Sequence, residues 1–340
     1  MAPVLRAAVY TDYVYRGDGD GIYAERAFAL FLVRLGAELG RLVVVGRLDP
    51  APGRWHYRLP DSAEFVALPY YARLTQPLAA GVAMLRSLRR FWHVVGGVDV
   101  VWLLGPHPLA IACAAIAKVR RRRVVLGVRQ DMPRYVARRH PGSPAARTLA
   151  SVLEHSFRVL ARRCRVVAVG PELARHYRGA RRLLELRVSL VRESDIVPAA
   201  FAEARPYDGL LQLLSVGRLD TEKNPLLLAD VLSELRRRDP RWRLVVCGEG
   251  PLEAALAERL RALGLERHAE LRGYVPLDDG LLDLYRQSHA FLHVSWTEGV
   301  PQVLFEAFAG RVPVVATDVG GVKEAAGGAA LVVPAGDASA

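Results

Sequence analysis

The sequence has few cysteines and no pattern that would link them. Cys113, Cys164 and Cys247 are the three among 340 residues, and each lies among apolar neighbours without a paired spacing. Disulfide frameworks and cysteine metal sites need paired or clustered cysteines, so both are excluded. We expect three small buried hydrophobes in a protein of a reducing compartment, the cytoplasm.

The sequence also lacks a long apolar run. The longest one, Pro108 to Ala117, is shorter than the roughly 20 residues that a membrane-spanning helix needs, and it fits a buried helix. Residues 1–10 have neither a charged start nor a cleavage site, so no signal peptide is expected. The chain is therefore predicted to be soluble and cytoplasmic, with peripheral attachment at the inner face of a membrane left open.

Lysine is scarce, although the chain is basic. Arginine supplies almost all of the 47 basic residues, and the formal net charge is +12. An anionic membrane, a phosphorylated donor or acceptor, and nucleic acid are the partners that such a surplus suits. A GC-rich genome also raises the arginine content without any binding role. Of these partners we predict peripheral contact with an anionic membrane, and no nucleic acid.

One arginine group lies beside an aromatic residue. Arg86, Arg89 and Arg90 fall near the end of a helix predicted from Thr75 to Phe91, and Trp92 follows directly. Arginine with aromatic and apolar neighbours suits a membrane surface. A solvated helix end is the alternative interpretation.

Strands and helices alternate along the whole chain. The length suits two domains, which we place at residues 1–203 and 204–340, around a polar linker from Ala202 to Gly209. Alternation of this kind predicts parallel, doubly wound sheets. The predicted fold class is α/β, with two Rossmann-like domains whose parallel sheets face a cleft.

The most informative stretch runs from Ser295 to Gly321. An apolar strand at Ala290–Val294 precedes a loop at Glu298–Gly299, and Pro301 suits the first position of the following helix. A second apolar strand, Val312–Ala316, completes a strand–helix–strand unit.

The start of this helix has the chemistry of an anion site. The backbone amides of Gly299, Val300 and Gln302 would point out of the helix N-terminus, where they can hold a phosphate. Glu298 and Glu306 flank these amides, and a carboxylate can accept two hydrogen bonds from a vicinal diol. A phosphate site between two such carboxylates suits a nucleotide-sugar. The alternative is that Glu298 caps the helix and Glu306 lies on a solvated face.

The pattern S-x-x-E-G-x-P-x-V-x-x-E-A, which starts at Ser295, closely resembles the E-x7-E motif of retaining GT-B glycosyltransferases. Phosphatidylinositol mannosyltransferases and lipopolysaccharide glucosyltransferases belong to this large family-4 type. The resemblance implies that the second domain binds a nucleotide-diphosphate-sugar without a metal or other cofactor. The implied donor-binding residues are Gly217, Arg218, Lys223, Tyr274, Glu298, Gly299, Val300, Pro301, Val303 and Glu306.

A second motif supports this donor site. Gly217-Arg218-Leu219 with Lys223 resembles the G-R-L-x-x-x-K motif of the same family, in which Arg and Lys hold the donor diphosphate. Arg offers a planar fork for phosphate oxygens and Lys a compact charge, so the chemistry agrees. Surface charges at a strand end are the alternative. In similar enzymes, the backbone after the glycine that precedes Tyr274 contacts the nucleotide base.

The first domain departs more from the family. A first strand at Ala7–Tyr10 is followed by Gly17, Gly19 and Gly21, interleaved with aspartates, and then by a predicted helix. A glycine loop between a strand and a helix can cradle a phosphate, and related enzymes have a Gly-Gly loop near the sugar and the acceptor. We predict an acceptor or sugar loop here, with a plain flexible loop as the alternative.

Three residues at predicted strand ends are further candidates for the first-domain site. Strand carboxyl ends face the ligand crevice in open α/β sheets, which makes Arg129 and Asp131 candidates, and a salt bridge between them is the alternative. The family histidine would fall on Leu104, so His107 is displaced from it. We name His107, Asp131 and Glu298 as catalytic candidates.

The resemblance is close from Leu213 to Pro334 and loose, by element order, from Ala7 to Val191. Related chains continue further, so we expect the C-terminal part of this sequence to be truncated. The favoured hypothesis is a retaining glycosyltransferase of cell-envelope glycan biosynthesis, with a glycan, lipid-linked or small-molecule acceptor.

Several alternatives stay open. One is a non-catalytic sugar-nucleotide-binding protein. Others are a GT-B-type nucleotide-sugar epimerase and a phosphorylase, which would need a pyridoxal lysine. A dinucleotide-dependent oxidoreductase is disfavoured because no G-x-G-x-x-G follows a strand and opens a helix.

Overall fold

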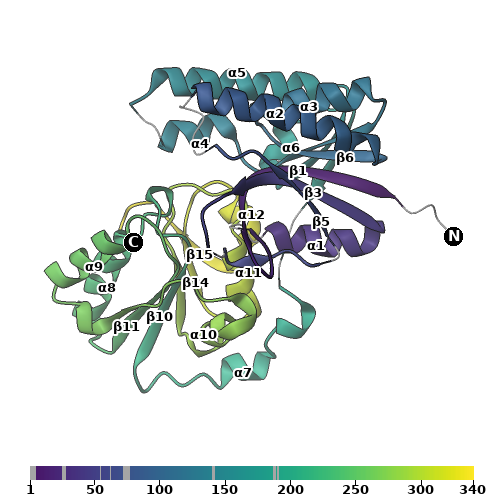
Figure 1. Cartoon of the computed structure of the whole chain (residues 1–340). Coiled ribbons are helices and arrows are strands. Elements are labelled where there is room, and N and C mark those ends of the chain that lie inside the picture. Colours follow the sequence, from purple (N-terminus) through teal and green to yellow (C-terminus); the bar gives the residue numbers. More distant parts are fainter. Residues whose placement is uncertain are drawn as a thin grey trace. The chain divides into compact units, whose positions relative to one another are not determined.

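The computed structural model describes residues 5–24, 28–53, 55–61, 63–71, 77–139, 142–186, 189 and 191–340. The chain divides into two compact units, Met1–Leu186 and Arg187–Ala340 (Figure 1). The sequence placed this boundary later, at 203/204.

The segment after the first unit packs on the second unit, which explains the earlier boundary. The backbone N–H of Val197 donates to the carbonyl of Ala309 at 2.8 Å. The buried guanidinium of Arg205 donates to the carbonyls of Gly310 and Arg311, both at 3.1 Å. These bonds close the end of a helix of the second unit, so the linker belongs to that unit.

The first unit is built on one sheet in the order β4-β2-β1-β6-β7-β8-β9, with β3 pairing β1 and β5. The pairs β1–β2 and β2–β4 are antiparallel, and the others are parallel. The strands are β1 (Arg6–Asp18), β2 (Gly21–Ala24), β3 (Arg41–Asp49), β4 (Tyr57–Arg58), β5 (Glu64–Leu68), β6 (Val100–Gly105), β7 (Arg123–Val128), β8 (Arg165–Val169) and β9 (Arg182–Leu186). The helices are α1 (Phe28–Leu39), α2 (Pro77–Gly96), α3 (Pro108–Val119), α4 (Met132–Arg139), α5 (Pro144–Ala161) and α6 (Pro171–His176).

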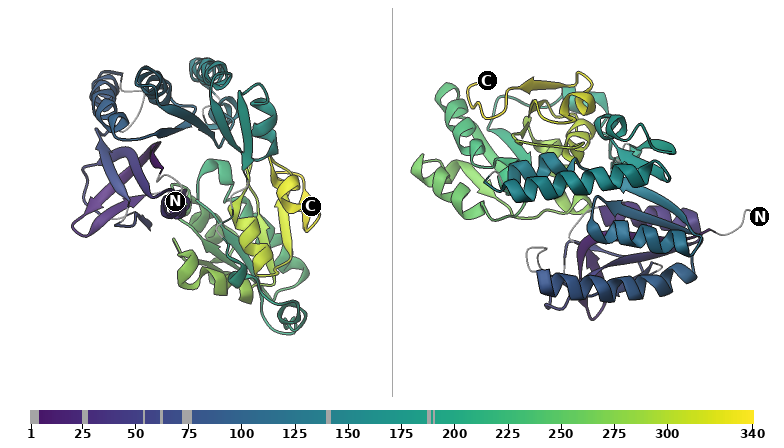
Figure 2. Two further views of the ribbon diagram at one scale, coloured as in Figure 1. Left: turned by 90° about the vertical axis from the view of Figure 1, so that its right-hand side faces the viewer. Right: turned by 90° about the horizontal axis from the view of Figure 1, so that it is seen from above.

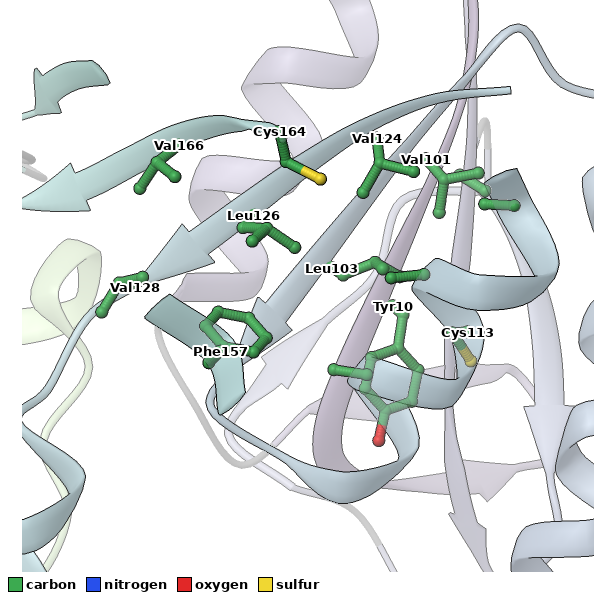
Figure 3. Packing of buried hydrophobic residues seen from close by; sticks show 14 of the residues in the cluster. Tyr10, Val101, Leu103, Cys113, Val124, Leu126, Val128, Phe157, Cys164 and Val166 are labelled. Atoms are coloured by element: carbon green, nitrogen blue, oxygen red, sulfur yellow. The ribbon is translucent and has the colours of Figure 1, made fainter. Parts of the chain in front are cut away.

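Helices cover this sheet on both faces. Alternate residues of β1 point to opposite sides, as the pleat of a strand requires. Ala8 and Tyr10 join the core beneath α2, α3, α5 and α6, whereas Ala7 and Val9 join the core beneath α1. Helices α2, α3 and α5 lie in one layer, seen nearly end-on in the left view of Figure 2. Figure 3 shows the larger core, where Tyr10, Leu103 and Phe157 pack with their neighbours.

The structure corrects two expectations for the first unit. Gly17, Gly19 and Gly21 do not form a loop that opens a helix. Strand β1 continues to Asp18, and the chain turns at residues 19–20 and returns as β2, so these glycines lie in a β-hairpin. Their role as an acceptor or sugar loop stays a prediction. Helix α2 extends to Gly96, so Trp92 lies within it and not after it. We also expected a strand at Val188–Val191, and its residues 188 and 190 lie outside the described residues.

The second unit contains a parallel sheet in the order β12-β11-β10-β13-β14-β15. The strands are β10 (Leu211–Val216), β11 (Trp242–Cys247), β12 (Ala269–Leu271), β13 (Ala290–His293), β14 (Val314–Thr317) and β15 (Ala330–Val333). The helices are α7 (Ala199–Glu203), α8 (Leu227–Arg238), α9 (Glu253–Ala262), α10 (Leu282–Gln287), α11 (Gln302–Ala309) and α12 (Val322–Ala326), with short turns η1 (Glu193–Asp195), η2 (Thr221–Lys223), η3 (Glu266–His268) and η4 (Leu277–Leu281). Helices α8 and α9 cover one face, and α10, α11 and α12 cover the other.

Candidate active site

The strand order of the second sheet reverses between β10 and β13. In open α/β sheets, ligands bind at such a switch point, outside the carboxyl ends of the strands. A cavity of about 170 Å³ lies there. Its walls include residues 215–219 at the end of β10, residues 293–295 at the end of β13, and residues 300–303 around the start of α11, together with Lys223 and Glu298.

Glu298 is the centre of a polar network in this cavity. Its side chain is 8% exposed, and its Oε1 atom accepts hydrogen bonds from His293 Nε2 at 2.9 Å, from Ser295 Oγ at 2.7 Å and from Lys223 Nζ. All three bonds end on Oε1. Within the described part of the chain, this leaves Oε2 as the oxygen that can accept from a bound hydroxyl.

The network keeps Glu298 ionised. Burial alone would raise the pKa of this carboxyl, but the charge of Lys223 and the hydrogen bonds from His293 and Lys223 outweigh burial and hold the pKa well below its usual range. Because Glu298 is ionised, His293 Nε2 must carry the proton of their hydrogen bond. The Nδ1 atom of His293 is buried and has no partner among the described residues.

Arg218 lines the same cavity and is held by two carboxylates. Its guanidinium pairs with Asp220 and, at 3.1 Å, with Glu222. These pairs fix the direction of a long side chain that is still 39% exposed. A phosphate that binds Arg218 would share the guanidinium with these carboxylates.

The start of α11 is held in place by a glycine pair. Gly321 N donates to Gly299 O at 3.0 Å. A Cβ atom on Gly320 would lie 1.9 Å from the carbonyl oxygen of Glu298, and one on Gly321 would lie 2.4 Å from that of Gly299. Only glycines allow this approach, so residues 320–321 set the backbone of the Glu298 loop.

Pro301 precedes α11 at the N-cap position, one residue before the helical position expected from the sequence. The amides of the first turn, at Gln302 and Val303, lie at the positive end of the helix dipole, and both residues line the cavity. This end of α11 and the two cations therefore converge on one hollow.

Glu306 lies one turn further along α11 and is buried. Its Oε2 accepts a hydrogen bond from Tyr285 Oη at 2.9 Å. Burial raises the pKa of this carboxyl, although the bond from Tyr285 opposes that effect. Glu306 does not belong to the cavity lining, so its role at a ribose stays a prediction. Tyr274 follows β12, and its backbone N–H donates to Glu249 Oε1 at 3.3 Å.

In the first unit, His107 lies at the end of β6 as the N-cap of α3. Its Nδ1 accepts from Leu109 N at 3.2 Å and lies 3.0 Å from Tyr10 Oη, and its Nε2 lies 3.2 Å from Tyr71 Oη. Burial lowers the pKa of His107, which favours the neutral ring. The arrangement suits a hydrogen-bonded neutral imidazole, either as a cap or as a proton acceptor.

Arg129 and Asp131 both follow β7 but have different surroundings. The Arg129 guanidinium lies 4.8 Å from the Tyr13 ring centroid, and burial lowers its pKa to about 10, so it stays charged at neutral pH. Asp131 caps α4 through Arg134 N at 3.0 Å and lies 3.6 Å from His176 Nδ1.

The sequence pattern missed His293, Ser295 and the carboxylate pair of Asp220 and Glu222. His293 is the last residue of β13, and Ser295 follows two positions later. The rule that strand carboxyl ends face the ligand crevice would have found both. Asp220 and Glu222 act through the direction of the Arg218 side chain, and the spacing of residues in the sequence does not predict that direction.

Solved structures with this architecture define the class of the fold. Sucrose-phosphate synthase from Thermosynechococcus elongatus matches with a TM-score of 0.70 and 18% identity, covering 99% of this chain and 87% of that chain. HepE from Anabaena, in complex with UDP, matches with a TM-score of 0.68 and 14% identity, covering 98% and 87%. At these identities the likeness shows the fold. The chain has the GT-B fold of two Rossmann-like domains, as expected.

Residues 198–340 match the model of the family described as Glycosyl transferases group 1. Mannosylfructose-phosphate synthase from Agrobacterium fabrum is 38% identical over 121 residues, which are 33% of this chain and 26% of that protein. Glycogen synthase from Mycobacterium tuberculosis is 34% identical over 125 residues, 37% of this chain and 30% of that protein. The chain thus matches less than a third of the length of these relatives.

Proposed function

We propose that the chain is a retaining glycosyltransferase that transfers a sugar from a nucleotide-diphosphate-sugar to a hydroxyl acceptor. The observation that carries the proposal is the convergence of Arg218, Lys223 and the N-terminus of α11 on one cavity at the switch point of a parallel sheet. The family of residues 198–340 and the UDP complex of HepE support the choice of a nucleotide-linked donor.

In this proposal, the cavity binds the donor pyrophosphate. Arg218 and Lys223 offset the negative charge that develops on the leaving diphosphate, and the amides of the first turn of α11 donate to its oxygens. These groups supply the electrostatic role of a divalent ion, so transfer should proceed without a metal. Glu298 Oε2 accepts from hydroxyls of the sugar, and Glu306 from the ribose.

The first unit binds the acceptor, which is a glycan, a lipid-linked sugar or a small molecule. His107 and Asp131, with Glu298, are the proposed catalytic residues. The leaving phosphate can itself take the acceptor proton when the acceptor attacks from the same face, and this keeps the anomeric configuration. A role in cell-envelope glycan biosynthesis, at the inner face of an anionic membrane, completes the proposal.

Two measurements test the donor site and the chemistry separately. Calorimetry with UDP, GDP and ADP should show one base bound in the micromolar range, and binding should persist in EDTA. Incubation with the matching nucleotide-sugars should release the nucleoside diphosphate, and proton NMR of the product should show the anomeric configuration of the donor. Binding without turnover of any donor would instead support the non-catalytic sugar-nucleotide-binding protein.

A further inference from the structure

Helix α2 carries an exposed apolar ridge. Leu78 is 86% exposed, Val82 50%, Leu85 70% and Trp92 38%. Their spacings of four, three and seven residues place them in one line along an α-helix. The opposite side of the helix carries the buried Phe91 into the core of the first unit. The ridge therefore faces away from the sheet, in the layer of helices at the top of Figure 1.

Basic residues flank the ridge, and helix α2 itself carries no acidic residue. Arg86 and Arg89 are exposed on the same side of α2. The sequences of α2 and of the neighbouring α3 contain neither Asp nor Glu. The basic residues on the exposed side of α2 therefore have no acidic residue beside them on these two helices.

The arginine run at 120–123 extends this charge at the end of α2. The Arg120 guanidinium lies 4.9 Å from the Trp92 ring centroid. Arg122 donates to the carbonyls of Val95 at 3.1 Å and Gly96 at 3.0 Å, which ties the run to the last turn of the helix. Arginine, tryptophan and exposed leucine are therefore combined in one surface.

We propose that this surface, the ridge of α2 with Arg86, Arg89 and residues 120–123, docks the chain on a membrane that contains anionic lipids. Leucine and valine would enter the boundary between headgroups and acyl chains, Trp92 would lie at the interface, and the guanidiniums would pair with lipid phosphates. The helix of 20 residues would lie flat over roughly 30 Å of membrane.

Charge complementarity selects this occupant. A second copy of the chain would bring the same arginines against Arg86 and Arg89, and like charges at close range oppose such a contact. An anionic lipid surface offers the opposite charge along the whole ridge, and it takes up leucine side chains without a shaped pocket. This inference rests on the membrane contact in the proposed function and assigns it to a particular surface. Lipid binding there does not depend on whether the donor site is active.

Vesicle sedimentation tests the docking surface. The full chain should bind vesicles of phosphatidylcholine with about 30% phosphatidylglycerol, and at least tenfold more weakly pure phosphatidylcholine or the anionic vesicles in high salt. The double variant Leu78→Ser/Leu85→Ser should lower the partition coefficient about tenfold. Arg86→Gln/Arg89→Gln should lower it several-fold and reduce its salt dependence.

Helix α5 offers a matched control. Leu149 and Val152 are 64% and 56% exposed, so Leu149→Ser/Val152→Ser removes a similar apolar area from the same layer. This control should bind anionic vesicles as the wild type does, and all variants should keep the wild-type melting temperature.

Three outcomes would overturn the inference. They are no binding of anionic vesicles, equal binding to neutral ones, and an equal loss in the α5 control. A dimer in size-exclusion chromatography that Leu78→Ser/Leu85→Ser turns into a monomer would assign the ridge to a second copy instead. Calorimetry with UDP on the same preparations reports the donor site, so a failed donor site and a failed docking surface give different results.

Discussion

His293 Nε2 lies 2.9 Å from Glu298 Oε1, and this bond joins the end of strand β13 to the loop that precedes helix α11. Lys223, from the other side of the strand-order switch, binds the same oxygen. The Glu298 carboxylate is thereby fixed between two loops before any ligand enters. A site fixed in this way loses little side-chain entropy when a donor binds.

Replacing Glu298 with glutamine should destabilise the fold at neutral pH. The variant leaves Lys223 beside a neutral group, and breaking a buried ion pair costs about 3 kcal/mol. Because the folded-state pKa of Glu298 is lowered, its stabilisation is present above the ordinary carboxyl pKa and is lost as pH falls towards the folded-state value. The difference in urea unfolding between wild type and Glu298→Gln should therefore be largest at pH 7 and should narrow steadily as the pH falls below the ordinary carboxyl pKa. A difference that grows in acid would contradict this assignment.

The contribution of Glu306 to stability should depend on pH in the opposite direction to that of Glu298. Burial raises its pKa, so its contribution to stability is fully present below the ordinary carboxyl pKa and is lost as pH rises through the raised value. Glu306→Gln keeps an acceptor for the Tyr285 hydroxyl and removes the buried charge. Thermal unfolding at pH 8 should then show a melting temperature equal to or above that of the wild type.

The same variant also tests the ribose contact. If Glu306 binds the ribose, Glu306→Gln should bind UDP about tenfold more weakly, because a hydrogen bond to a charged group is lost. Inorganic pyrophosphate has no ribose and serves as the control, since its affinity should not change. Unchanged UDP affinity would leave Glu306 with a purely structural role beside Tyr285.

Lys223 should be required for diphosphate binding. Lys223→Ala removes a charge-assisted hydrogen bond from the cavity and should weaken UDP binding by roughly 10- to 100-fold. Lys323→Ala is the matched control, because Lys323 is exposed and pairs with Asp318 outside the cavity. Calorimetry at low salt measures both. Equal affinities for the two variants would remove Lys223 from the donor site.

The second unit was predicted well because its signals are local. Apolar runs separated by glycine and proline predict the parallel strands and the helices directly. Arg218, Lys223 and Glu298 come shortly after the ends of two such strands. Their gathering in one cavity then follows from parallel pairing of β10 with β13. The sheet faces and the helix after Pro301 could therefore be predicted from the sequence.

The first unit was predicted less well because its irregular features depend on pairing between distant residues. The hairpin at Asp18 forms because β1 continues beside β2 and β3, with a register shift between Tyr10 and Val14. Glycines interleaved with aspartates are compatible with both a phosphate loop and this hairpin. The exposed ridge of α2 also could not be predicted, because the side of an apolar helix that meets the sheet is decided by packing.

Gly320 should be sensitive to a single methyl group. Gly320 and Gly327 have φ angles of 53° and 54°, but a Cβ atom would meet Glu298 O at 1.9 Å only at Gly320, and at Gly327 nothing lies within 4 Å. Gly327→Ala should cost about 1–2 kcal/mol of unfolding free energy through backbone strain alone. Gly320→Ala should cost more and also weaken UDP binding, because the Glu298 loop must move. If urea unfolding shows the same loss of unfolding free energy for Gly320→Ala and Gly327→Ala, the contact between residue 320 and the Glu298 carbonyl has no energetic cost.

Replacing His293 should show whether this residue orients the Glu298 carboxylate for catalysis or contributes to nucleotide binding. His293→Phe fills the buried site but removes the Nε2–H donor, so the Glu298 carboxylate keeps Lys223 and loses one of the bonds that fix its direction. We expect kcat for the nucleotide-sugar to fall by roughly 10- to 100-fold, as for a catalytic contact displaced by about 1 Å.

UDP affinity should stay within about twofold of the wild type, since pyrophosphate contacts need no change at Glu298. His293→Asn, which retains a donor close to the carboxylate, should recover part of kcat. If His293 only fills space, the phenylalanine variant would keep kcat and the asparagine variant would be the less stable of the two. Steady-state kinetics with thermal unfolding of both variants therefore distinguishes a positioning residue from a packing residue.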